Sequence, residues 1–192
     1  MKPLAAVLIF LVAGVVFAQT TGRGSAAQTP RVTAPSGRGA ATVSTSARPD
    51  ATLLQLMRGV LYPASNVIFA AQDDLGKYTP PDDPSTSLNP ITSTYGGWDA
   101  VENASLALAE ATRLLTVSGR PCSNGKIAPV QRADWKKYAD GLRQAALKSY
   151  KAAQMKSTDA MVDAASDLSE ACAMCHQVYR EKPNGNQDRC LP

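Results

Sequence analysis

Residues 171–182, ACAMCHQVYREK, close a long helical pattern and raise the question of what two cysteines and one histidine do there. On a helix, Cys172 and Cys175 are three positions apart and share a face. His176 lies beside Cys175 and one turn from Cys172, and it is the single histidine of the 192-residue chain. The stretch therefore predicts two thiols and an imidazole directed at the same place.

Upstream of this stretch, the sequence predicts a first helix that begins after Asp50, a suitable N-cap, and ends near residue 72. Pro63 interrupts the apolar pattern, so we expect one helix with a kink or two short helices in line. Residues 76–97, with their prolines and glycines, predict a long loop. A second helix is predicted over about 98–118.

Two further helices complete the predicted fold. Pro129 suits the first turn of the third helix, and Ser157 or Thr158 caps the fourth, which ends before Pro183. No segment alternates with period two for long enough to be a convincing strand. Four helices with short connections after the second and the third predict an all-α, antiparallel four-helix bundle over residues 51–192.

The first 50 residues differ from the bundle in composition. Residues 1–18 predict a cleaved signal peptide, with a lysine, an apolar run and a small-residue cleavage site. The apolar run is shorter than the roughly 20 residues that span a bilayer, so we expect no stable membrane insertion after cleavage. Residues 19–50, rich in Gly, Ser, Thr, Ala and Pro, predict a flexible linker. Together these segments predict a periplasmic protein.

Charge is divided unevenly between the linker and the bundle. The whole chain has a formal net charge of +4, whereas residues 51–192 hold 15 Lys plus Arg and 15 Asp plus Glu. This balance argues against a nucleic-acid-binding face. The linker carries the excess of arginine, and we expect it to be a solvated spacer.

The spacing C-x-x-C-H is the attachment pattern of haem c, in which two sulfurs form thioethers and the imidazole binds the iron. Zinc would need four Cys or His ligands in characteristic pairs, and Cys122 and Cys190 are isolated. A thioredoxin-like C-x-x-C would follow a strand, and a disulfide within this motif is strained on a helix. We therefore predict one haem c, covalently bound through Cys172 and Cys175, with His176 as an iron ligand.

The same stretch resembles the cytochrome c-prime superfamily. The superfamily signature C-x-x-C-H-x-x-[Phe/Tyr]-[Arg/Lys] is matched by Cys172, Cys175, His176, Tyr179 and Arg180. The resemblance implies that Tyr179 packs beside the porphyrin and that Arg180 lies near the haem edge. The alternative for Arg180 is a solvated charge that favours the helix C-terminus.

The resemblance also bears on the sixth coordination position of the iron. In low-spin members a methionine of the first helix binds the iron, and in high-spin members an apolar side chain leaves the position open. Met57 lies where that ligand would be, so it is a candidate for binding both iron and cofactor. A methionine at helical spacing among leucines also fits the core, and both interpretations remain open.

These features predict a periplasmic monohaem c-type cytochrome that transfers single electrons with redox partner proteins and is not an enzyme. The alternative is haem-based binding of small gases, nitric oxide or carbon monoxide, at an open distal site. Whether Met57 binds the iron discriminates between the two. Some relatives dimerise through their first two helices, so the resemblance also raises the expectation of a homodimer.

The two remaining cysteines follow helices that end at the same pole of an up-down-up-down bundle. Cys122 follows the second helix and Cys190 follows the fourth. In an oxidising compartment this arrangement predicts a disulfide between them. The alternative is a pair of free thiols.

Overall fold

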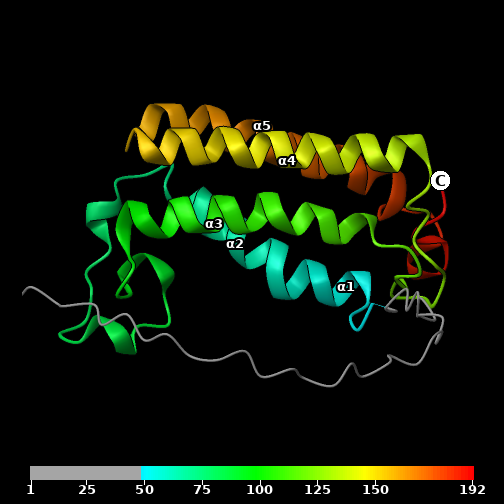
Figure 1. The fold of residues 1–192 in the computed structure, drawn as a ribbon, viewed down its shortest axis with the longest axis horizontal. Helices are drawn as coiled ribbons and strands as arrows, with labels where there is room; N and C mark the ends of the chain where they lie inside the picture. The colour runs from blue at the N-terminus through cyan, green and yellow to red at the C-terminus, as the bar shows by residue number, and fades with distance from the viewer. Residues whose placement is uncertain (1–48) are drawn as a thin grey trace, which may run out of the picture. The chain divides into compact units, whose positions relative to one another are not determined.

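The computed structural model describes residues 49–192, so the predicted signal peptide and almost all of the predicted linker lie outside the described residues. Within 49–192 the chain forms an all-α bundle of four helices with no strand (Figure 1). The first helix has three consecutive segments, α1 (Leu53–Leu56), a π-helical segment (Met57–Leu61) and α2 (Tyr62–Ala70). The others are α3 (Gly97–Ala111), α4 (Ala133–Gln154) and α5 (Thr158–Tyr179).

The first helix begins two residues later than predicted, because Thr52 rather than Asp50 is the N-cap. Thr52 Oγ1 accepts a hydrogen bond from the Gln55 N–H at 3.2 Å. Gln55 Oε1 in turn accepts one from the Thr52 N–H at 2.9 Å. This reciprocal capping box satisfies two backbone donors that no helical carbonyl can reach.

Pro63 is absorbed by a wider helical turn, so the first helix stays continuous. Proline has no N–H and cannot donate to the carbonyl four residues back. Just before it, the N–H of Tyr62 donates to the carbonyl of Met57, five residues back. Such π turns insert one extra residue into a helix and are frequent at functional sites. The two predicted alternatives were one helix with a kink and two short helices in line. The consecutive segments support the single helix, and its irregularity is the π-helical segment Met57–Leu61, just before Pro63.

The predicted loop 76–97 is present, and it contains short 3-10 turns that periodicity did not reveal. Asp83 and Asn89 each precede a proline and cap a turn. Their side chains accept hydrogen bonds from the N–H groups of Ser85 and Ile91, both at 3.0 Å. Ile91 is buried and anchors the loop on the main core.

The prediction that Pro129 lies in the first turn of the third helix is wrong. The carbonyl of Pro129 accepts a hydrogen bond from the N–H of Arg132 at 3.0 Å, in a turn that precedes α4. Asp134 lies in the first turn of α4, where a negative charge is favourable. Its carboxylate also accepts the N–H of Trp135 at 3.0 Å, which fixes the start of the helix there.

The connections between the last three helices differ in length. The α4–α5 connection is short, as predicted, and the Ser157 hydroxyl accepts the N–H of Ala160 at 3.2 Å as the N-cap of α5. The α3–α4 connection is longer than predicted, because it holds a 3-10 turn (Thr112–Thr116) and an isolated bridge between Pro121 and Ile127. This longer connection supplies one side of the site pole, which we define as residues 51–57, 115–135 and 172–190.

Backbone and side-chain bonds tie the segments of the site pole together. The indole N–H of Trp135 donates to the carbonyl of Leu115 at 2.9 Å, joining the start of α4 to the 3-10 turn that follows α3. The N–H of Leu53 donates to the carbonyl of Pro121 at 2.8 Å. Arg120 is buried, and its Nη1 donates to the carbonyl of Ala51 at 2.6 Å. The start of the first helix is therefore attached to the α3–α4 connection.

The core away from the site pole is built largely from alanine. Small residues on α4 and α5 let the two helices approach closely, and larger side chains fill the remaining space. The largest fully buried apolar side chains are Ile68, Leu108, Met161, Leu168 and Val101. Two fully buried hydroxyls, Ser105 and Ser149, donate to the carbonyls four residues back at 2.8 and 3.1 Å. Their burial therefore leaves no polar atom without a partner.

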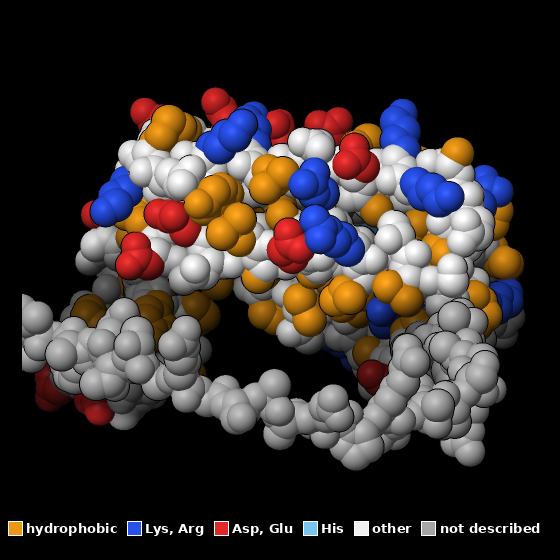
Figure 2. Space-filling model, viewed as in Figure 1, with side chains coloured by type: hydrophobic (Ala, Val, Ile, Leu, Met, Phe, Trp, Pro, Cys, Tyr) orange, Lys and Arg blue, Asp and Glu red, His pale blue; other side chains and the backbone are white. Residues whose placement is uncertain are grey.

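The surface of the bundle carries both signs of charge. On the face in Figure 2, Lys and Arg side chains are interspersed with Asp and Glu side chains over the helices. Among residues 49–192, none of the helices combines the length and the apolar composition that membrane crossing requires.

Candidate functional site

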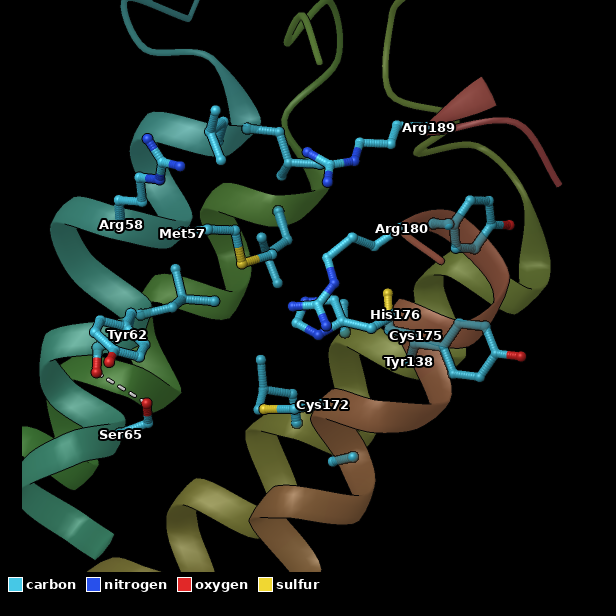
Figure 3. Close-up of a pocket in the computed structure, with 18 of the residues that line it drawn as sticks. Met57, Arg58, Tyr62, Ser65, Tyr138, Cys172, Cys175, His176, Arg180 and Arg189 are labelled. Carbon is cyan, nitrogen blue, oxygen red and sulfur yellow. Dashed lines mark hydrogen bonds between the residues drawn. The ribbon is translucent and has the colours of Figure 1, made fainter. Parts of the chain in front are cut away.

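A cavity of about 680 Å³ opens at the site pole between the first helix and the end of α5 (Figure 3). Its walls also include the start of α4 and the segment after α5. The lining is mostly apolar and includes Leu53, Leu54, Leu61, Phe69, Leu108 and Leu115. Cavities of this size with a few polar groups are typical of cofactor and ligand sites.

The two thiols and the imidazole predicted from the C-x-x-C-H spacing all line this cavity. Cys172, Cys175 and His176 are half-buried. Figure 3 shows the side chains of Cys172 and His176 directed into the open space. Both cysteines are free thiols. α5 continues to Tyr179, so the spacings of three and four positions place the three side chains on one face.

The surroundings hold these groups in defined protonation states. Burial raises the pKa of both thiols, and that of Cys175 rises to about 11, with further contributions from Cys172 and Asp134. Burial lowers the pKa of His176, and the positive charge of Arg180 lowers it further. Nucleophilic and redox-active cysteines show the opposite shift. At neutral pH the thiols are therefore protonated, and the neutral imidazole keeps a lone pair for a metal.

The first helix presents a row of side chains to the same cavity. On a regular α-helix, residues four apart drift around the axis by about 40° at each step. The π-helical segment has more residues per turn and counteracts this drift. It thereby helps to keep on one wall the residues Leu53, Met57, Leu61, Ser65 and Phe69, which are spaced by four and all line the cavity.

Met57 is the one methionine among residues 49–192 that lines the cavity. It is half-buried, and Figure 3 shows its thioether directed from the first helix toward the α5 side. Met161 is fully buried in the core, while Met155 and Met174 are 64% and 41% exposed. These positions separate Met57 from the other methionines in a way that helical spacing alone did not.

Tyr179 is buried and belongs to a network that fixes the end of α5. Its hydroxyl donates to Asp134 Oδ2 at 2.8 Å and accepts a hydrogen bond from Arg132 Nε at 3.1 Å. The Tyr179 ring meets the Trp135 ring edge to face, with centroids 4.8 Å apart. The pair Arg132 and Asp134 was not predicted as part of the site. Its sequence signal is an ion pair two residues apart at a helix start, which is too common to be specific.

Arg180 extends over the cavity from the residue after α5. Figure 3 shows its guanidinium beside the ring of His176. The side chain is 52% exposed and forms an ion pair with Glu181, with Nε donating to Oε1 at 2.6 Å. Arg180 lines the cavity and is also a solvated charge at the C-terminus of the helix, as the alternative prediction has it; its position near a haem edge stays a prediction.

The predicted disulfide between Cys122 and Cys190 is present, with Cα atoms 6.5 Å apart. Both cysteines are buried and both touch the cavity. The disulfide brings Arg189, which was not predicted as a site residue, to the cavity wall. No sequence signal singles out this arginine, because its position depends on the folded course of the tail.

The residues present are compatible with a haem. Two unbonded thiols three positions apart and a neighbouring imidazole open onto a single apolar cavity of about 680 Å³. The thioether of Met57 lies on the opposite wall of the cavity, on the first helix. The cavity also contains a buried donor without a partner, the Nε atom of Arg189, which suits a cofactor that carries carboxylates.

Neither a search for other metal sites nor a comparison with known proteins assigns a function to the cavity. Within the described part of the chain, no group of three or more His, Cys, Asp and Glu side chains forms a metal cluster. Comparisons with protein-family models, with curated proteins and with solved structures found no match for this chain.

Proposed function

We propose that this protein is a periplasmic monohaem c-type cytochrome that transfers single electrons. The observation that carries the proposal is the meeting of Cys172, Cys175 and His176 at one apolar cavity, opposite Met57. The predicted signal peptide over residues 1–18 supports export to a compartment in which disulfides persist. The disulfide between Cys122 and Cys190 is consistent with such a compartment.

Each residue has a defined task in this proposal. Cys172 and Cys175 would form the thioether bonds, and His176 would bind the iron. When bound, haem supplies a reversible one-electron change of its iron. The apolar lining, which includes Leu61, Leu108 and Phe69, would give a haem a less polar surrounding, and this affects the reduction potential.

The hydrogen-bond network of Tyr179, three residues after His176, fixes the end of α5 that carries the imidazole. The Tyr179 hydroxyl is held by Asp134 and Arg132, and its ring packs on Trp135. These contacts attach the last turn of α5 to the start of α4. A ligand on a rigid helix end changes its position little between oxidation states, as electron transfer requires.

Gas binding is a second candidate because of Leu61. This residue is 6% exposed, lines the same wall as Met57 and lies one turn from it. An apolar side chain opposite the imidazole would leave the sixth position open to nitric oxide or carbon monoxide. Electron transfer is favoured because the thioether of Met57 is directed into the cavity.

The proposal is tested first by covalent attachment. The full-length chain is produced in a host that matures c-type cytochromes, and the holoprotein is digested for peptide mass mapping. One haem on the peptide that carries Cys172 and Cys175 is expected. A chain exported and folded without any haem contradicts the proposal.

The second step compares optical spectra of ferric and ferrous protein, with and without carbon monoxide, for the wild type and Met57→Ala. Met155→Ala is the matched control, since Met155 is exposed and remote from the cavity. A low-spin spectrum whose methionine–iron charge-transfer band disappears only in Met57→Ala is expected for a carrier. A high-spin spectrum that Met57→Ala leaves unchanged, together with ready carbon monoxide binding, would move the assignment to gas binding.

A further inference from the structure

Arg189 is the residue of the cavity whose environment is least explained by the bundle itself. Its Nε atom is buried and has no hydrogen-bond partner within residues 49–192. Its side chain takes part in no ion pair with the described residues. Figure 3 shows the side chain reaching from the tail across the cavity toward α1. A buried donor on a cationic group is costly to leave unpaired, so a partner from outside the described residues is expected.

The other charged groups that line the cavity do not provide this partner. Among the described residues, Glu181 is the one carboxylate in the lining, and it is bound to Arg180. Arg58 lies on the first helix and is exposed. Within residues 49–192 the lining therefore carries three arginines and one glutamate, and the donor that is buried and unpaired there belongs to Arg189. This excess of positive charge in an apolar cavity favours an anionic ligand.

The backbone that carries Arg189 is held in place by several independent bonds. Cys190 is joined to Cys122, and its N–H donates to the carbonyl of Tyr179 at 2.8 Å. Cys190 adopts a φ of 65°, a conformation that residues other than glycine rarely take. Asn124 Nδ2 donates to the carbonyl of Arg189 at 3.0 Å and to the carbonyls of residues 186 and 187. A side chain mounted on such a fixed segment loses little freedom when it binds a ligand.

We propose that Arg189 binds a propionate carboxylate of the haem, and this assignment rests on the proposed function. Haem is apolar apart from its iron and its two propionates, so these are the anions that it would bring into the cavity. A guanidinium donates a planar pair of N–H groups, which matches a carboxylate and forms short, charge-assisted hydrogen bonds. The disulfide-bonded tail thus forms part of the cofactor site, in addition to stabilising the bundle.

The test uses the matured, full-length holoprotein and three variants. Arg189→Met removes the charge and all donors while keeping an unbranched chain. Arg189→Lys keeps the charge but loses the planar pair of N–H donors. Arg113→Met is the matched control, since Arg113 is 69% exposed and does not line the cavity. For each protein we measure the haem content, the midpoint potential from pH 4 to 9 and the propionate bands in the resonance Raman spectrum.

In Arg189→Met we expect unchanged haem content and a lower midpoint potential, because the loss of a positive charge favours ferric iron. The pH range over which the potential depends on propionate ionisation moves upward by about 1 to 3 pH units, since a nearby cation holds a carboxylate pKa down. The propionate Raman bands shift as well. Arg189→Lys restores most of the potential but not the bands, and Arg113→Met matches the wild type.

The outcomes separate this assignment from the proposed function. A wild type without covalent haem overturns both. Variants that all carry haem, with an Arg189→Met potential, pH profile and Raman spectrum equal to those of Arg113→Met, overturn the role of Arg189 alone. Loss of folding in Arg189→Met leaves Arg189→Lys as the decisive variant, and unchanged Raman bands there also contradict the assignment.

Discussion

Two pairs of cysteines line the cavity at the site pole, and they differ in their bonding. Cys122 and Cys190 are 68 positions apart, lie outside the helices and form a disulfide. Cys172 and Cys175 are three positions apart on α5, and both remain free thiols. Sequence distance therefore did not decide which cysteines are joined. Backbone geometry did, because a helix fixes the positions of neighbouring thiols, whereas loops can bring distant ones together.

This difference suggests a division of labour between the pairs. The disulfide closes the pole and holds the tail against the α3–α4 connection, so it stabilises the fold. The free pair faces the open space of the cavity, where it is available for thioether bonds. Tyr179 connects the two regions. Its carbonyl accepts the Cys190 N–H, and the residue lies three positions after His176 on α5.

The largest expected effect separates the pairs by haem content. Replacing Cys172 and Cys175 with serine removes both thioether bonds, so we expect complete loss of covalently bound haem in denaturing gels stained for haem. The double replacement of Cys122 and Cys190 with serine is the matched control and retains the haem. Haem that stays covalently attached to the Cys172→Ser, Cys175→Ser variant would contradict the division of labour.

The next effect concerns stability. Opening the disulfide by Cys122→Ser and Cys190→Ser releases a loop of 68 residues, which the loop-entropy estimate equates with about 4 kcal/mol of unfolding free energy. Urea unfolding of the holoprotein, followed by circular dichroism, measures this loss. A change below about 1 kcal/mol would mean that hydrogen bonds from Asn124 hold the tail without the disulfide.

A smaller, pH-dependent effect is expected at the junction between the two regions. Hydrogen bonds from Arg132 and then from Tyr179 lower the pKa of Asp134 to about 2, below its usual value of 3.8. The resulting stabilisation is present above about pH 4 and is lost as the pH falls toward 2. Asp134→Asn removes it, so unfolding midpoints of the variant and the wild type differ at pH 7 and converge at pH 2. Asp140→Asn, at an exposed position of α4, is the control. Its unfolding midpoint should match that of the wild type at both pH 7 and pH 2.

The smallest effect is expected at the start of the first helix. Thr52→Ala removes one half of the capping box, which costs about 1 kcal/mol in typical helices. The Leu53 N–H remains bound to the Pro121 carbonyl, so the cavity wall should keep its place. We expect a lower urea midpoint with an unchanged haem spectrum. A changed spectrum would show that the cap also positions Met57.

Much of the fold followed from local patterns. Apolar spacing predicted four helices. Ser157 or Thr158 was predicted as the cap of α5, because a hydroxyl before an apolar run satisfies free N–H groups, and the cap is Ser157. The prediction for Pro129 failed because proline is equally favoured in turns, and the acidic residue at Asp134 decided the start of α4. The π-helical segment was missed because one extra residue does not disturb an apolar pattern spaced by four.

The C-x-x-C-H part of the candidate site was predictable because its residues are close in sequence. Cys172, Cys175 and His176 lie within one turn and a half of a helix, so their common direction follows from helical geometry. Arg132 and Asp134 meet Tyr179 from another helix, across 47 and 45 positions, and no local pattern announces that contact.

The sequence by itself therefore determined the helices, the shared face of the C-x-x-C-H motif and the two thiols left outside it. Each of these depends on spacing within a few residues. Only the tertiary structure decided that Met57 lines the cavity of the motif, that Arg132 and Asp134 meet Tyr179, and that Arg189 lies over the cavity. These relations join distant segments through packing and loop closure, and the free energies that select them belong to the whole bundle rather than to any one stretch.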